Sequence, residues 1–64
     1  MQAADDNLIN IKSVLKLVPV SRPTIYRMMQ KGEFPRPVEI GASRFWLERE
    51  IADWKSDKIA ARHA

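Results

Sequence analysis

Two arginines, a tyrosine and a glutamine recur at helical spacing in the stretch RPTIYRMMQ. Arg22, Tyr26 and Gln30 stand at positions i, i+4 and i+8, so a helix would place all three on one face. Pro23 and Arg27 neighbour that face. Arginine can donate a pair of hydrogen bonds to O6 and N7 of guanine, and glutamine can pair with adenine. These residue types at this spacing indicate contact with base edges in the major groove of DNA.

The start of the same stretch carries groups that suit a phosphate. The hydroxyls of Ser21 and Thr24 lie where the first turn of a helix leaves backbone N–H groups without a partner. Lys12, Lys31 and Arg36 would add phosphate contacts that raise affinity without selecting bases. The alternative is a solvated helix face on which Ser21 acts only as a cap. We favour DNA contact because an exposed tyrosine between two arginines would have no packing reason to be there.

A further basic position follows the sequence GAS. Arg44 stands beside Ser43, just past the expected tip of a β-hairpin. An arginine at the tip of such a wing commonly enters the minor groove or binds phosphate. The alternative is an exposed arginine that keeps an edge strand from pairing with another chain. We expect Ser43 and Arg44 to contact DNA.

The first element that must position these groups is a short amphipathic helix. Val14, Leu15 and Val18 recur at helical spacing, with Lys12 or Ser13 near the start of the helix. A proline follows directly, and the residue before a proline is pushed out of helical geometry. The sequence therefore predicts that this helix ends at about Val18.

Prolines, a serine and a glycine mark the bounds of a second helix. Pro19 separates it from the first, and Ser21 is the expected N-cap. Pro23 falls in the first turn, where a missing N–H costs nothing. The helix is expected to run to about Lys31, with Gly32 just beyond its end. Two short helices joined by a tight turn predict a helix-turn-helix.

Short strands and a last helix complete the expected plan. The segment LINI reads as a small strand or an apolar anchor, and EFPRP reads as an extended connection. VEI and RFW flank GAS and predict a hairpin. A helix is expected over residues 47–62, with a buried stripe of Leu47, Ile51 and Trp54 that reaches toward Ile59. The fold class is therefore mainly α with a small β-hairpin, a winged helix-turn-helix.

The aromatic residues are expected to serve mostly as core. Phe34, Trp46 and Trp54 supply the large apolar bodies that a small domain needs. Phe45 alternates with Trp46 on one strand, so the two point to opposite faces. We expect Phe45 to be exposed or to contact a partner.

Composition bounds the class of protein. The 64 residues suffice for one domain, which we expect over residues 8–62 after a flexible tail at residues 1–7, and the net charge is +3. Seven basic and two acidic residues give the segment 12–47 a charge of +5, whereas the remainder is −2. The positive charge thus lies where a DNA-contacting face would need it.

Several classes of function find no support in the sequence. There is no cysteine and one histidine, His63, and no glycine-rich phosphate loop or apolar run long enough to span a membrane. We expect neither a signal peptide nor an enclosed pocket in a chain of this kind and size. We expect a cytoplasmic protein that is not an enzyme and has no cofactor, no metal, no small-molecule ligand and no membrane partner.

One longer pattern resembles a known family. The stretch VPVSRPTIYRMMQKGEFPRPVEIG, followed by a tryptophan on the second wing strand and by EREIADW, resembles the AlpA-type phage and prophage regulators. These are small winged-helix proteins related to the MerR DNA-binding domain and to phage excisionases. The resemblance covers about residues 9–54, and the chain departs from it at Pro19, where many members carry a turn glycine. Carried over by position, the recognition helix and the wing correspond to Ser21, Arg22, Thr24, Tyr26, Arg27 and Arg44.

The resemblance implies a sequence-specific protein that binds double-stranded DNA in the bacterial cytoplasm. Its role would be transcriptional regulation of a prophage or genomic island, excision of such an element together with a tyrosine integrase, or both. We expect cooperative self-association on repeated sites, because a single module buries only about 600–1,000 Å². The alternative is an adaptor that contacts integrase through the last helix and Phe45 without reading DNA.

Overall fold

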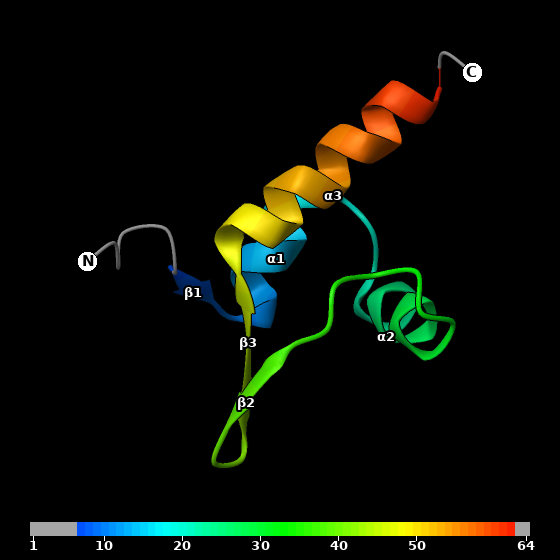
Figure 1. The fold of residues 1–64 in the computed structure, drawn as a ribbon. Helices are drawn as coiled ribbons and strands as arrows, with labels where there is room; N and C mark the ends of the chain where they lie inside the picture. The colour runs from blue at the N-terminus through cyan, green and yellow to red at the C-terminus, as the bar shows by residue number, and fades with distance from the viewer. Residues whose placement is uncertain (1–6, 63–64) are drawn as a thin grey trace.

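The computed structural model describes residues 7–62, which form three helices and a three-stranded antiparallel sheet (Figure 1). In chain order the elements are β1 (Leu8–Ile9), α1 (Ile11–Leu17), α2 (Arg22–Gln30), β2 (Val38–Ile40), β3 (Ser43–Leu47) and α3 (Glu48–Ala61). The predicted winged helix-turn-helix is confirmed, with β1 added to the hairpin in the strand order β1-β3-β2. His63 and all but the last residue of the expected tail lie outside the described residues.

Helix α1 begins at Ile11, directly before Lys12. Its N-cap is Asn10, whose side-chain oxygen accepts a hydrogen bond from the N–H of Ser13 at 3.0 Å. Lys12 and Ser13 lie in the first turn, as expected, and the cap itself is Asn10, whose side chain satisfies a backbone N–H of that turn. The predicted end is confirmed: Val18 is extended, as the following Pro19 requires.

Helix α2 begins as predicted. Ser21 is extended, and its Oγ accepts from the N–H of Thr24 at 3.3 Å. Pro23 lies in the first turn, where its missing N–H leaves no bond unmade. The residues SRP therefore fix where the helix starts.

The end of α2 is fixed by a glycine in left-handed geometry. Gly32 has φ +72°, a conformation that other residues adopt only at a cost. Its N–H donates to Met29 O at 3.1 Å, and the N–H of Glu33 donates to Met28 O at 2.8 Å. This pair of bonds is the Schellman motif, which ends the helix and turns the chain toward the wing.

The hairpin closes through a two-residue turn. Ile40 pairs with Ser43, so the turn consists of Gly41 and Ala42 rather than of all three residues of GAS. Gly41 has φ +62° and Ala42 has no positive φ, as in a type II′ turn. This register places Glu39 directly opposite Arg44.

The core lies between the helices and the inner face of the sheet. In the described part of the chain it consists of six buried side chains: Val14, Val18, Ile25, Phe34, Trp46 and Ile51. Trp54 is half-buried and packs against them, with its ring in edge contact with Phe34 at 4.8 Å between centroids. Phe45 lies on the other face of β3, as the alternation with Trp46 requires, but it is half-buried rather than exposed.

Two tryptophans hold the connection between α2 and the wing. Trp46 Nε1 donates to Pro35 O at 3.0 Å, and Trp54 Nε1 donates to Glu33 O at 2.9 Å. Both acceptors are main-chain carbonyls of a segment that has no helix or strand of its own. These bonds set the position of α2 relative to β2 and β3.

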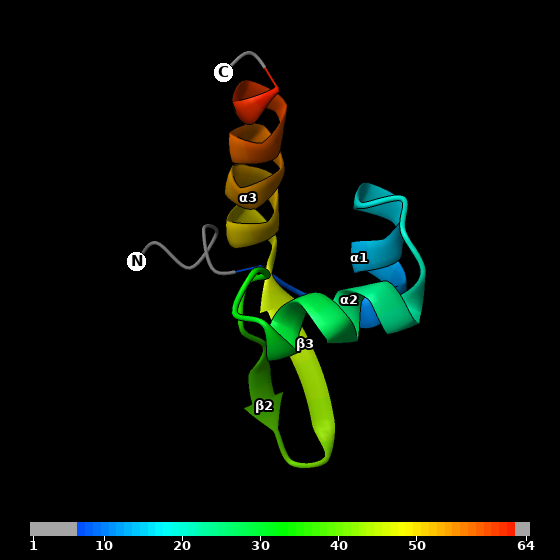
Figure 2. The ribbon, with the colours of Figure 1, turned by 90° about the vertical axis from the view of Figure 1, so that its right-hand side faces the viewer.

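Helix α3 extends past the core on the side opposite to the hairpin tip (Figures 1 and 2). Ile51 is fully buried, but Ile59 is 53% exposed, so the buried stripe ends at Trp54. Lys58 Nζ lies over the Trp54 ring, 5.5 Å from its centre, in a cation–π contact. No helix in residues 7–62 has the length and hydropathy to cross a membrane.

Candidate nucleic-acid interface

The outer face of α2 presents polar and basic groups. Arg22, Arg27 and Gln30 are exposed, whereas Ile25 on the opposite side is fully buried. Tyr26 is half-buried, so the expectation of a fully exposed tyrosine is wrong. Its side chain lines the hollows between α2 and the hairpin, together with Arg44.

The start of α2 carries a chain of hydrogen bonds that the sequence alone did not reveal. Ser21 Oγ and Thr24 Oγ1 lie 2.8 Å apart, and Arg27 Nη2 donates to Thr24 Oγ1 at 3.3 Å. The spacing i, i+3, i+6 permits these contacts, but only rotamers reveal them. The guanidinium is thereby held near the helix N-terminus, where hydroxyls and backbone N–H groups also favour an anion.

A groove lies between α2 and the hairpin. It has a volume of about 330 Å³ and is lined by Tyr26, Met29, Gln30, Arg36, Pro37, Glu39 and Arg44. Arg36, expected to be at best a non-specific contact, thus lies in one groove with Gln30 and Arg44. A second hollow, whose lining includes Tyr26, Arg44 and Trp46, adjoins it. Tyr26 therefore stands between the helix and the wing.

The wing arginine has an acidic neighbour. Arg44 Nε lies 3.5 Å from Glu39 Oε2, with the two side chains 51% and 65% exposed. An ion pair this exposed contributes about 0–1 kcal/mol, so a phosphate could replace the carboxylate at little cost. Ser43 is exposed at the tip, beside Ala42.

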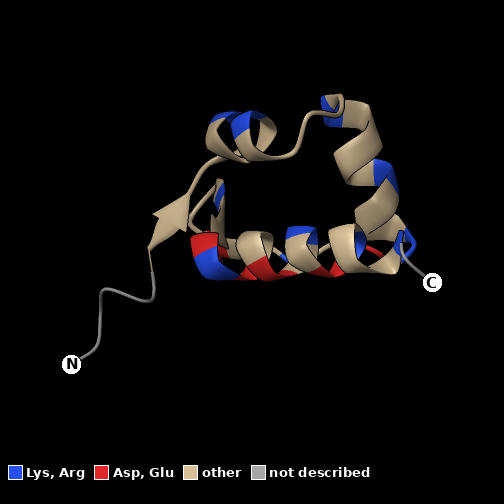
Figure 3. Cartoon of the chain, turned by 90° about the horizontal axis from the view of Figure 1, so that it is seen from above, with Lys and Arg blue, Asp and Glu red and all other residues tan. Residues whose placement is uncertain are grey.

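Charge divides between two sides of the molecule. Four of the six described acidic residues lie on α3, where acidic positions follow mainly the edge that faces away from α1 and α2 (Figure 3), although Glu48 lies beside the hollow between α1 and α3. Lys31 is exposed at the end of α2, and Lys12 is exposed on α1. A polyanion would therefore meet attraction on the side of α2 and repulsion along the outer edge of α3.

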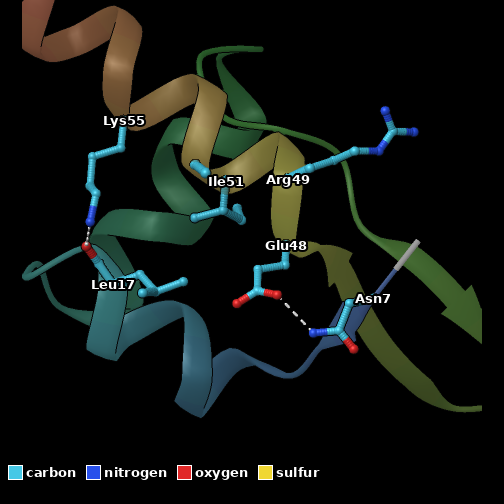
Figure 4. A pocket seen from close by; sticks show the side chains of 7 residues that line it. Asn7, Leu17, Glu48, Arg49, Ile51 and Lys55 are labelled. Atoms are coloured by element: carbon cyan, nitrogen blue, oxygen red, sulfur yellow. Dashed lines mark hydrogen bonds between the residues drawn. The ribbon is translucent and has the colours of Figure 1, made fainter. Parts of the chain in front are cut away.

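A further hollow of about 350 Å³ lies between α1 and the first turns of α3 (Figure 4). Lys55 Nζ donates to Leu17 O at 3.1 Å across it, and Asn7 Nδ2 donates to Glu48 Oε1 at 2.8 Å. The N–H of Glu48 also donates to Asn7 O at 2.8 Å. These paired groups fasten α3 to α1 and to the start of β1, which is a structural role.

The arrangement of two short helices followed by a hairpin beside the second helix defines a winged helix-turn-helix protein. Residues 7–59 match the family described as prophage CP4-57 regulatory protein (AlpA), and the chain belongs to this family. It is also 36% identical over 58 residues to the uncharacterized protein ORF88 of Enterobacteria phage P4. That alignment covers 89% of this chain and 66% of the phage protein. The resemblance noted in the sequence is confirmed.

Proposed function

We propose that this protein is a sequence-specific DNA-binding regulator of a prophage or genomic island. Helix α2 enters the major groove, and the hairpin lies over the neighbouring minor groove. The observation that carries the proposal is that Arg22 and Arg27 are exposed on α2, and that the groove beside this helix is lined by Arg36 and Arg44. Membership of a family of prophage regulators supports the same conclusion.

The residues of the interface divide by the part of DNA that they meet. Arg22, Tyr26 and Gln30 share one face of α2 and select bases, with Pro23 providing an apolar contact beside them. A second group of residues contacts the DNA phosphates and positions the protein on the duplex. This group consists of Ser21, Thr24, Arg27, Lys31, Ser43 and Arg44. Arg27 belongs to this second group because its bond to Thr24 holds it at the start of the helix.

The same surface serves either of two regulatory roles. A transcriptional regulator binds at a promoter, whereas a recombination directionality factor binds beside an attachment site and acts with a tyrosine integrase. Footprinting on the DNA of the host element distinguishes them: protection at a promoter supports regulation, and protection beside an attachment site supports excision. Protection at both places supports a protein with both roles.

The binding experiment starts from duplexes selected by the wild-type protein from a random pool. Arg22→Ala and Arg27→Ala should each weaken binding to the selected duplex roughly tenfold or more, as expected when a charge-assisted contact is lost. Arg62→Ala is the matched control, because it removes the same charge from the exposed end of α3. Failure to select any duplex would contradict the proposal. Unchanged DNA affinity in Arg27→Ala, with integrase binding lost in Phe45→Ala, would favour the adaptor.

A further inference from the structure

The outer face of the hairpin is apolar and uncovered. Ile40 is 53% exposed and Val38 is 37% exposed, and the two residues alternate with Glu39 along β2. Phe45, which pairs with Val38, lies on the same face and is half-buried. Glu39 lines the groove beside α2, so Val38 and Ile40 project to the other side.

The tip of the hairpin is narrow apart from Ile40. Gly41, Ala42 and Ser43 follow it, and all three are small and exposed. A Cβ built on Gly41 would have no atom within 4 Å, so open space surrounds the turn. Ile40 is therefore the bulky side chain at the end of a slender projection.

The charged groups of the hairpin are turned away from this apolar face. Arg44 pairs with Glu39 at 3.5 Å, and both side chains line the groove that faces α2. Figures 1 and 2 show that the tip extends beyond the helices, away from the end of α3. The large exposed side chain nearest the tip is thus hydrocarbon rather than a cation.

We propose that Ile40 is an apolar wedge that enters the minor groove and opens a base step, so that the protein bends its DNA. This inference depends on the proposed function, because it needs α2 in the adjacent major groove. Isoleucine is among the side chains that minor-groove proteins insert between base pairs to kink the duplex. We infer DNA as the binding partner of this tip because the strands that carry Ile40 also carry Glu39 and Arg44. These two residues line the basic groove on the opposite face of the hairpin. Arg44 then binds a phosphate at the groove edge instead of entering it.

The wedge is tested on the selected duplex, labelled at both ends for energy transfer. Wild type should shorten the end-to-end distance. Ile40→Ala should abolish most of that shortening and weaken binding roughly tenfold, since the bend permits contacts that are otherwise lost. Ile40→Leu should keep the bend. Val38→Ala is the matched control, because it removes apolar atoms from the same face two residue pairs farther from the tip, and it should change affinity less than about twofold.

Salt dependence separates a wedge from a charge contact. Ile40→Ala should leave the slope of log Kd against log salt unchanged, whereas Arg44→Ala should reduce its magnitude by about 1. Thermal melts of each variant check that the fold is kept.

Wild-type binding without a bend, or an Ile40→Ala protein that bends DNA like wild type, would overturn the wedge while leaving the proposed function intact. Equal losses in Ile40→Ala and Val38→Ala with an unchanged bend would also overturn it, and would indicate that this face binds another protein chain. If wild type selects no duplex, the proposed function fails and the wedge fails with it.

Discussion

The indole N–H of Trp46 donates to the main-chain carbonyl of Pro35 at 3.0 Å, inside a core where the Trp46 side chain is fully buried. This bond joins the central strand of the sheet to the segment that leaves α2. The angle between the helix and the wing therefore depends on a core residue, and binding should depend on it as well.

Replacing this tryptophan should damage stability and binding together. Trp46→Phe removes the donor and leaves a void, and we expect a loss of about 2–4 kcal/mol in the free energy of unfolding. Urea denaturation measures the loss. Trp54→Phe removes a comparable bond to Glu33 from a half-buried ring and should cost less. Equal losses of stability in the two variants would contradict the larger contribution that we assign to Trp46.

The two helix caps should have separable effects. Ser21→Ala and Asn10→Ala each remove an N-cap and should lower the free energy of unfolding by about 1 kcal/mol. Only Ser21→Ala should also weaken DNA binding at a temperature where both variants are folded, because Ser21 is bonded to Thr24, which holds Arg27. Matched binding losses in the two variants would show that Ser21 acts on stability alone.

The glycine that ends α2 is expected to tolerate substitution poorly for a backbone reason. Gly32→Ala should lower the free energy of unfolding by about 1 kcal/mol, because φ +72° is unfavourable for alanine although the space beside it is open. Gly32→Asn should cost less, since asparagine visits this conformation more readily. Calorimetric melts test whether Gly32→Ala loses more stability than Gly32→Asn. A Gly32→Ala protein as stable as wild type would contradict backbone strain at this position.

Removing the acidic partner of the wing arginine should strengthen binding. Glu39→Gln takes away a carboxylate that competes with phosphate for Arg44, and we expect a rise in affinity of about two- to fivefold at low salt. Stability should change little because the ion pair is exposed. Fluorescence anisotropy at several salt concentrations measures the effect. A weaker complex would mean that Glu39 positions Arg44 productively.

Much of the fold follows from short-range rules visible in the sequence. Pro19 and Ser21 set the boundary between the first two helices, and Gly32 sets the end of the second, because each acts through its own backbone conformation. The cap at Asn10 does not stand out in the sequence because it lies inside an apolar segment, although asparagine is a good cap residue.

The details of the site depend on long-range packing and were harder to predict. The pairing of Glu39 with Arg44 requires the register of a two-residue turn, and a three-residue turn at GAS would have moved it. Tyr26 is half-buried because the hairpin folds back beside α2, which no helical periodicity can reveal. Ile59 fits the spacing of the buried stripe but lies beyond the end of the core it would pack against.

The most direct test of the central claim is an NMR titration of the ¹⁵N-labelled protein with the selected duplex. We predict that the largest amide shift changes fall at residues 21–31 and 38–44, with little change at residues 57–62 at the end of α3. A complex in which the changes concentrate on α3, while α2 and the hairpin keep their shifts, would contradict the account.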